Sequence, residues 1–142
     1  MFSPDIYFTG QIQRKNNLTM LFTESQAIYL QIAKIIEEKI LRKEWGTGER
    51  IPSVRDLAVA MEVNPNTVVR TYEILQQKEM IYNKRGIGYF VSENACSLIQ
   101  NEWKTNFKEQ ELPVFFKTIS LLDFYMNEIN LLYQQYQEKN NK

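Results

Sequence analysis

Residues 63–72 constrain the fold more than any other part of the chain. Asn64 followed by Pro65 predicts a helix that begins at Pro65, because asparagine caps helix N-termini and proline fits the first helical position. Apolar residues then recur at helical spacing. We expect them to form a buried stripe made of Val68, Val69, Tyr72 and Leu75.

The opposite face of this predicted helix is polar, with Asn66, Arg70 and Gln77 pointing to solvent and Thr67 near the helix start. Asparagine pairs bidentately with adenine and arginine with guanine in the DNA major groove. An exposed helix start with an amide, a hydroxyl and a guanidinium therefore predicts base readout.

A shorter helix is predicted just before it, over residues 53–61 with Ser53 as its cap. Its inward positions are Val54, Leu57, Ala58 and Met61. Only Glu62 and Val63 remain as a turn between the two helices. Two helices joined so tightly, the second polar at its start, indicate a helix-turn-helix.

A basic hairpin is predicted after the two helices, with strands over 80–82 and 89–91 and a glycine-containing tip over 84–88. Such a hairpin is a wing. Lys84 and Arg85 suit a phosphate or a minor groove, and Gly86 lets the backbone approach closely.

Three separated blocks, residues 48–58, 63–72 and 85–91, resemble the winged-helix domain of GntR-type bacterial transcription regulators. The middle block and the short tail after the wing are similar to the YtrA subfamily. The resemblance implies DNA contacts by residues at the matching positions, which are Arg55, Asn64, Asn66, Thr67, Arg85 and Gly86.

The chain departs from the family pattern at two recognition positions. Many members carry arginine where this chain has Pro65 and Val69, whereas Arg70 lies one place further on. Helical geometry therefore moves the predicted base contacts to Asn66 and Arg70. Ser53, with the amides around it, is expected to hold a phosphate together with Arg55 at the start of the shorter helix.

Composition excludes several other classes of protein. The chain has 142 residues, room for one domain and an appendage, and its 17 basic and 17 acidic residues balance, so any basic surface must be local. Histidine is absent and Cys96 is the single cysteine, which removes the commonest general base and any internal disulfide. We expect no enzyme activity, no cofactor and no metal site.

The first part of the chain is less informative. Residues 1–20 resemble neither a signal peptide nor a membrane span, and we interpret them as an extension of a cytoplasmic protein. A helix capped by Thr23 or Ser25 is predicted through Arg42. Its buried stripe is Tyr29, Ile32, Ala33, Ile36 and Ile40, and its solvent-facing charges are Glu37, Glu38, Lys39 and Lys43.

The tail, residues 94–142, predicts two helices separated by a stop and restart at 109–113. The first begins at Ser92 or Asn94 and carries Leu98, Ile99, Trp103 and Phe107. The second carries an unbroken a/d seam over three heptads. That seam comprises Phe115, Ile119, Leu122, Met126, Ile129, Tyr133 and Tyr136.

Three uses for that apolar face compete: packing within the monomer, a ligand pocket, and pairing with a second copy. Helix-turn-helix proteins usually bind inverted repeats as twofold dimers, and the YtrA resemblance implies the same. Dimerisation is therefore favoured, and a small-molecule effector stays open.

The predicted architecture is mainly α with a small β-hairpin: an extension (1–20), a winged helix-turn-helix domain (21–93) and two dimerisation helices (94–142). The predicted function is sequence-specific DNA binding, as a homodimeric repressor on a palindromic operator. The alternative is a winged helix used only for protein contacts. Its mark would be apolar or acidic recognition residues, unlike those found here.

Overall fold

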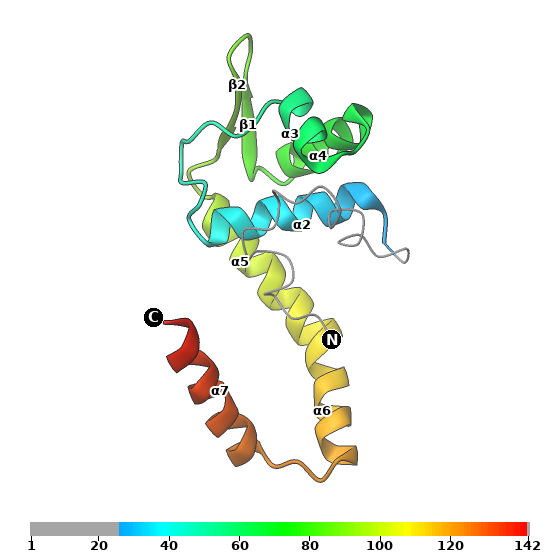
Figure 1. Ribbon diagram of the computed structural model, residues 1–142, viewed down its shortest axis with the longest axis vertical. Coiled ribbons are helices and arrows are strands. Elements are labelled where there is room, and N and C mark those ends of the chain that lie inside the picture. The colour runs from blue at the N-terminus through cyan, green and yellow to red at the C-terminus, as the bar shows by residue number, and fades with distance from the viewer. Residues whose placement is uncertain (1–25, 142) are drawn as a thin grey trace. The chain divides into compact units, whose positions relative to one another are not determined.

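A computed structural model describes residues 26–141 (Figure 1). The chain divides into two compact units, one ending at Gln100 and one beginning at Asn101. Each unit is described by itself. The predicted extension (1–20) and the predicted caps Thr23 and Ser25 lie outside the described residues.

The first helix of the described chain, α2 (Ile28–Leu41), is amphipathic, as predicted. Ile32, Ala33, Ile36 and Ile40 are buried, while Tyr29 is half-buried. The prediction for Glu37 is wrong. It is only 3% exposed, and its carboxylate lies 3.9 Å from the Lys78 ammonium at the end of α4. Helix periodicity placed Glu37 next to the apolar stripe, on the solvent side. Packing of α2 against α4 buries the Glu37 side chain.

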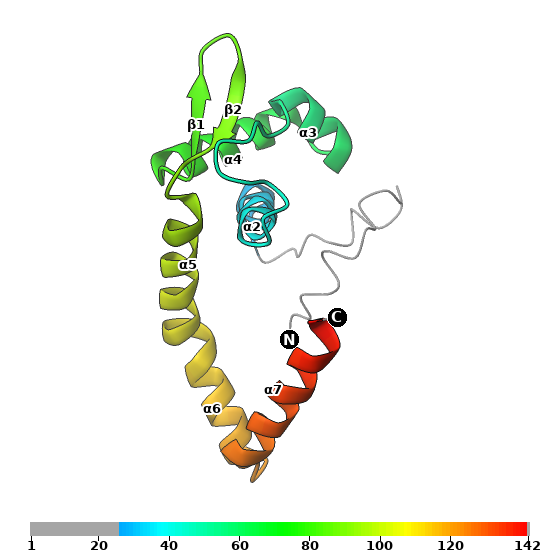
Figure 2. The same cartoon turned by 90° about the vertical axis from the view of Figure 1, so that its left-hand side faces the viewer.

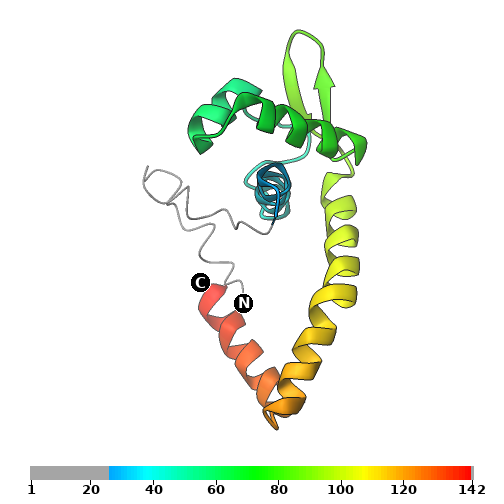
Figure 3. The same cartoon turned by 90° about the vertical axis from the view of Figure 1, so that its right-hand side faces the viewer.

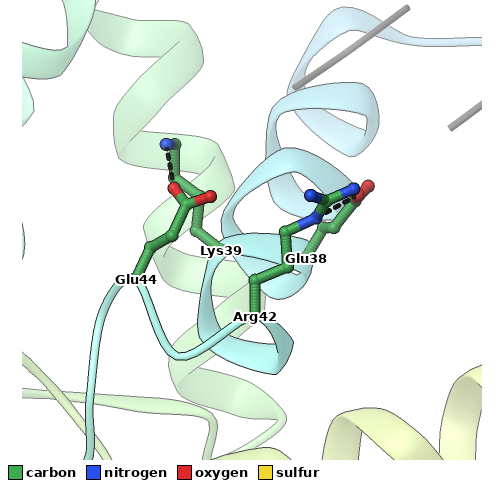
Figure 4. Close-up of polar contacts among 4 residues, drawn as sticks. All are labelled: Glu38, Lys39, Arg42 and Glu44. Atoms are coloured by element: carbon green, nitrogen blue, oxygen red, sulfur yellow. Dashed lines mark hydrogen bonds and ion pairs between the residues drawn. The ribbon is translucent and has the colours of Figure 1, made fainter. Parts of the chain in front are cut away.

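Ion pairs close the C-terminal end of α2 on its exposed side (Figure 4). Arg42 Nε donates to Glu38 Oε1 at 3.0 Å, one helical turn apart, and Lys39 Nζ donates to Glu44 Oε2 at 2.8 Å. Cations near the last carbonyls of a helix interact favourably with its dipole. These contacts mark where α2 ends and the chain turns.

The helix-turn-helix consists of α3 (Val54–Met61) and α4 (Pro65–Gln77), as predicted. Ser53 Oγ accepts from the Asp56 N–H at 3.1 Å, and Asn64 Oδ1 accepts from the Asn66 N–H at 2.8 Å. Both caps are those that the sequence predicts. Glu62 adopts a left-handed conformation (φ 54°), which ends α3 and makes the tight turn.

Strands β1 (Ile81–Lys84) and β2 (Gly88–Val91) form an antiparallel hairpin in which Ile81 pairs with Val91 and Lys84 with Gly88. Residues 48–51 run alongside β2 as a short third segment. The Ile51 N–H donates to the Tyr89 carbonyl at 2.9 Å, and Arg50 pairs with Phe90. The hairpin projects on the side of α4 opposite α2 (Figures 2 and 3).

The core of the first unit lies where α2, α3, α4 and the hairpin meet. Its largest fully buried side chains are Ile32, Ile36, Ile51, Val68, Thr71, Tyr72, Leu75, Met80, Ile81, Val91 and Ile99. The Tyr72 hydroxyl donates to the Pro52 carbonyl at 2.6 Å, which joins α4 to the segment before α3. Burial raises the pKa of the Tyr72 phenol well above its usual range, so the hydroxyl remains a donor.

Helix α5 (Ala95–Asn106) begins directly after Asn94, one of the two predicted starts. The predicted stop and restart at 109–113 is wrong. A π-helical turn, η3 (Phe107–Glu111), leads directly into α6 (Leu112–Leu121). Pro113 lacks an N–H and would clash with the carbonyl four residues back in a regular α-helix, and a wider turn relieves that conflict.

The predicted continuous seam helix is also wrong, because the chain turns between α6 and α7 (Met126–Asn140) (Figure 3). Asp123 takes a left-handed conformation (φ 49°), and Glu128 Oε1 accepts the N–H of Tyr125, which caps α7. The spacing of four from Leu122 to Met126 suits a helix equally well. The apolar period therefore continues across a turn that it does not reveal.

No residue of α6 or α7 is buried. Of the predicted seam, Phe115, Ile119 and Ile129 are half-buried, and the other members are exposed, with Leu122 67% and Met126 57% exposed. Phe116, Leu121, Leu131 and Leu132 add further exposed apolar surface. The second unit thus presents an apolar face that its own helices do not cover.

Candidate nucleic-acid interface

The start of α4 presents polar groups to solvent. Asn66 is exposed and Thr67 half-exposed, and the Asn66 side chain has no part in the cap, which uses only its N–H. The Asn64 side chain, by contrast, is committed through its oxygen to the cap, leaving its amide nitrogen to contact DNA. The exposed amide of Asn66 is therefore free to read a base edge.

Arg70 is exposed on α4, but its guanidinium carbon lies 3.9 Å from the centroid of the Tyr29 ring on α2. On the hairpin side of α4, Tyr72 meets Tyr89 edge to face, with ring centroids 4.7 Å apart. Residues of a helix are offset by about 100°, so Arg70 and Tyr72 lie on nearly opposite flanks. Arg70 thus lies at the edge of α4 nearer α2.

Val69 differs from its prediction. It was expected to join the buried stripe, yet it is 39% exposed. Val69 lies about 60° around the helix from Tyr72, on the flank nearer the hairpin. Its methyl groups can contact the C5-methyl of thymine. Sequence reasoning missed this position because an apolar residue beside an apolar stripe appears to belong to the core.

The start of α3 carries Ser53, Arg55 and Asp56. The Ser53 hydroxyl accepts from the Asp56 N–H and also donates to Asp56 Oδ2 at 2.7 Å, so the side chain is committed to the helix cap. A carboxylate in this first turn disfavours a phosphate beside it. Arg55 is exposed in the same turn and is the group there best suited to a phosphate.

The wing tip is a turn in which the Ile87 N–H donates to the Lys84 carbonyl at 2.9 Å. Gly86 has φ 78°, a conformation that glycine adopts without strain, and Arg85 beside it is exposed. The Lys84 ammonium lies 4.7 Å from the centroid of the Phe90 ring. Tip and strand together therefore present two cations.

The described part of the chain offers little for other chemistry. Among residues 26–141, no three acidic, cysteine or histidine side chains gather as a metal site. No helix in this range has the length and apolarity to cross a membrane. Cys96 is half-buried, with its Sγ 3.8 Å from the Ile40 carbonyl, and it links α5 to α2.

A helix-turn-helix with a polar recognition face, followed by a basic hairpin, defines a winged helix-turn-helix protein of the DNA-binding kind. The family model for bacterial regulatory proteins of the gntR family matches residues 28–91. The chain belongs to the GntR family of transcription regulators, whose winged-helix fold the structure confirms.

Similar proteins are also described as transcriptional regulators of the helix-turn-helix type. The uncharacterized HTH-type transcriptional regulator YhcF of Bacillus subtilis is 37% identical over 108 residues, covering 76% of this chain and 88% of that protein. The HTH-type transcriptional repressor YtrA of the same organism is 38% identical over 86 residues, covering 61% and 66%. This similarity supports the YtrA-like assignment. The relatives are regulators, and the chain is not an enzyme.

A solved structure agrees over most of the chain. The crystal structure of a GntR-family transcriptional regulator from Bacteroides thetaiotaomicron aligns with a TM-score of 0.64 at 44% identity, covering 80% of this chain and 98% of that one. The likeness therefore extends beyond the winged-helix domain into the helices that follow it.

Proposed function

We propose that this protein is a homodimeric repressor that binds an inverted-repeat operator in the cytoplasm. The observation that carries the proposal is the exposed start of α4 beside a basic wing. The residues that read bases are Asn66, Thr67, Arg70 and Val69, which the structure leaves exposed. Asn64 adds its side-chain amide nitrogen as a donor. The similarity to YtrA, described as a repressor, supports the sign of regulation.

Contacts to the DNA backbone are made by groups outside α4, at the start of α3 and on the wing. Arg55 serves the start of α3, where the Asp56 carboxylate disfavours a phosphate at the amides after Ser53, and Lys84, Arg85 and Gly86 serve the wing. Phosphate contacts fix the register of a protein on the duplex without reading sequence. Two opposite edges held in this way would orient α4 in the major groove.

The second unit supplies the dimer contact. Its uncovered apolar face includes the predicted interface residues Phe115, Ile119, Leu122, Met126, Ile129, Tyr133 and Tyr136. Burying apolar area contributes roughly 25 cal/mol per Å², so a face of this kind favours a second copy. Twofold pairing matches a palindromic operator with two half-sites.

The test is the binding of the purified protein to the DNA upstream of its own gene, beside a shuffled duplex of equal length. We expect salt-dependent binding with two protomers per palindromic site. The double variant Asn66→Ala, Arg70→Ala should lose the preference for that site. Gln77→Ala, Glu79→Ala, which changes exposed polar groups at and beyond the far end of α4, is the matched control.

Two outcomes would contradict the proposal in different ways. Equal binding to upstream and shuffled DNA would favour a winged helix used for protein contacts. Operator preference that survives the double variant would leave the regulator but remove α4 as its reader.

A further inference from the structure

Arg50 lies outside the helices and the wing tip, yet it belongs to the outer face of the wing. It pairs with Phe90 at the edge of the hairpin. Side chains of paired residues lie on the same face of a sheet, so Arg50 shares a face with Phe90, Tyr82 and Lys84. Its neighbour Ile51 lies on the opposite face and is 2% exposed in the core.

Gly88 makes room for the Arg50 guanidinium. A Cβ atom added at Gly88 would lie 2.8 Å from Arg50 Nε, closer than real Cβ atoms come to another group, and 3.3 Å from Nη2. The guanidinium therefore lies directly over the backbone of Gly88, which pairs with Lys84 at the last rung before the wing tip.

The Arg50 charge is not neutralised within the described part of the chain. No carboxylate of residues 26–141 forms an ion pair with it, and Arg50 is exposed. The adjacent Glu49 points elsewhere, because its Oε2 accepts from the Gly46 N–H at 2.8 Å. Arg50 thus presents an unpaired fork of N–H donors beside two other wing cations, Lys84 and Arg85.

From this geometry we infer that Arg50 binds a DNA backbone phosphate and that Gly88 leaves the space in which its guanidinium lies, close to the tip of the wing. A guanidinium matches a phosphate bidentately, and a fork packed against backbone loses little freedom on binding. The contact carries no sequence information, so Arg50 positions the wing rather than reading bases. The inference rests on the DNA binding proposed above.

The experiment compares four full-length proteins: wild type, Arg50→Met, Arg50→Lys and Lys34→Met. Arg50→Met keeps an unbranched apolar chain over Gly88 and removes the charge, whereas Arg50→Lys keeps the charge and removes the fork. Lys34→Met is the matched control, since Lys34 is exposed on α2, on the side of α4 away from the wing. Thermal unfolding of each variant checks that the fold is intact.

Binding is measured by fluorescence anisotropy from about 0.05 to 0.3 M salt. One duplex is selected by the wild type from a random pool, and the other is its shuffled version. For Arg50→Met, the slope of log affinity against log salt should fall by about 0.9 for each bound protomer, with affinity about fourfold lower per protomer at 0.2 M salt. Both duplexes should be affected alike. Arg50→Lys should keep the slope and bind somewhat less tightly.

The outcomes separate this inference from the function on which it rests. If the wild type prefers the selected duplex and Arg50→Met keeps its slope, or changes no more than Lys34→Met, the phosphate contact is wrong and the regulator stands. If Arg50→Lys loses the slope as Arg50→Met does, charge is not the cause and the inference is also wrong. A wild type that enriches no sequence from the random pool and binds no DNA would overturn both.

Discussion

The guanidinium carbon of Arg70 lies 3.9 Å from the centroid of the Tyr29 ring, so an arginine of α4 is held against α2. A cation over an aromatic face gains roughly 0.5–1 kcal/mol at an exposed site. That energy is small beside a bidentate contact to guanine, so the stack can be exchanged for DNA. In the proposed complex Arg70 leaves this ring for the DNA, and Tyr29 would then be the resting position of its side chain in the free protein.

Arg70→Ala should weaken operator binding by about 1–3 kcal/mol and relax the preference at one base pair, because a bidentate base contact is lost. The measurement is affinity for a panel of single-base operator variants. Tyr29→Leu is the companion variant and should leave the base preference intact. If both variants lower the free energy of unfolding equally and leave the base preference unchanged, Arg70 serves to stabilise the packing of α4 against α2 and does not read a base.

Tyr72→Phe should lower the free energy of unfolding by about 1 kcal/mol, since it removes the 2.6 Å hydrogen bond to the Pro52 carbonyl from a buried site. Urea unfolding measures this change. Tyr82→Phe, at an exposed ring of the hairpin, is the control and should have almost no effect. A loss no greater than that of the control would mean that the Pro52 carbonyl finds another donor.

Leu122→Glu should convert the proposed dimer to a monomer while the winged-helix domain stays folded, because a charge at a 67% exposed position costs the monomer little and an apolar interface much. Light scattering gives the mass, and operator affinity should fall with it. Asn130→Glu is the control: it adds the same charge at an exposed polar position on α7 and should leave the mass unchanged. A Leu122→Glu protein that remains dimeric would exclude this residue from the interface.

Glu38→Gln should remove part of the pH dependence of stability. Burial raises the pKa of the Glu38 carboxyl above its ordinary 4.5, against the opposing effect of Arg42. The folded protein then holds this proton more tightly than the unfolded chain, so this contribution is present below pH 4.5 and is lost as pH rises through the raised value.

Urea unfolding midpoints, measured from below pH 4.5 to neutral pH, report this pH dependence of stability. Glu44→Gln, in the neighbouring ion pair, is the control (Figure 4). The Glu38→Gln protein should show a smaller fall in stability with rising pH than the wild type. Identical pH profiles would place the dependence on another group.

Local signals in the sequence determined most of the first unit. The caps at Ser53 and Asn64, the proline at the first position of α4 and the glycine at the wing tip each specify backbone conformation through their own chemistry. Apolar periodicity identified the core positions, such as Val68, Leu75 and Ile99. These features act within a few residues, so they can be predicted from order alone.

Only the tertiary structure decided features that depend on contacts between distant segments. The burial of Glu37, the exposure of Val69 and the stack of Arg70 on Tyr29 follow from how α4 packs against α2 and the hairpin. Arg50 lies on the wing because residues 48–51 run beside β2. No local sequence pattern predicts this pairing. The turn at Asp123 was hidden because its spacing keeps the helical period. Periodicity records which residues are apolar, whereas packing decides which faces meet.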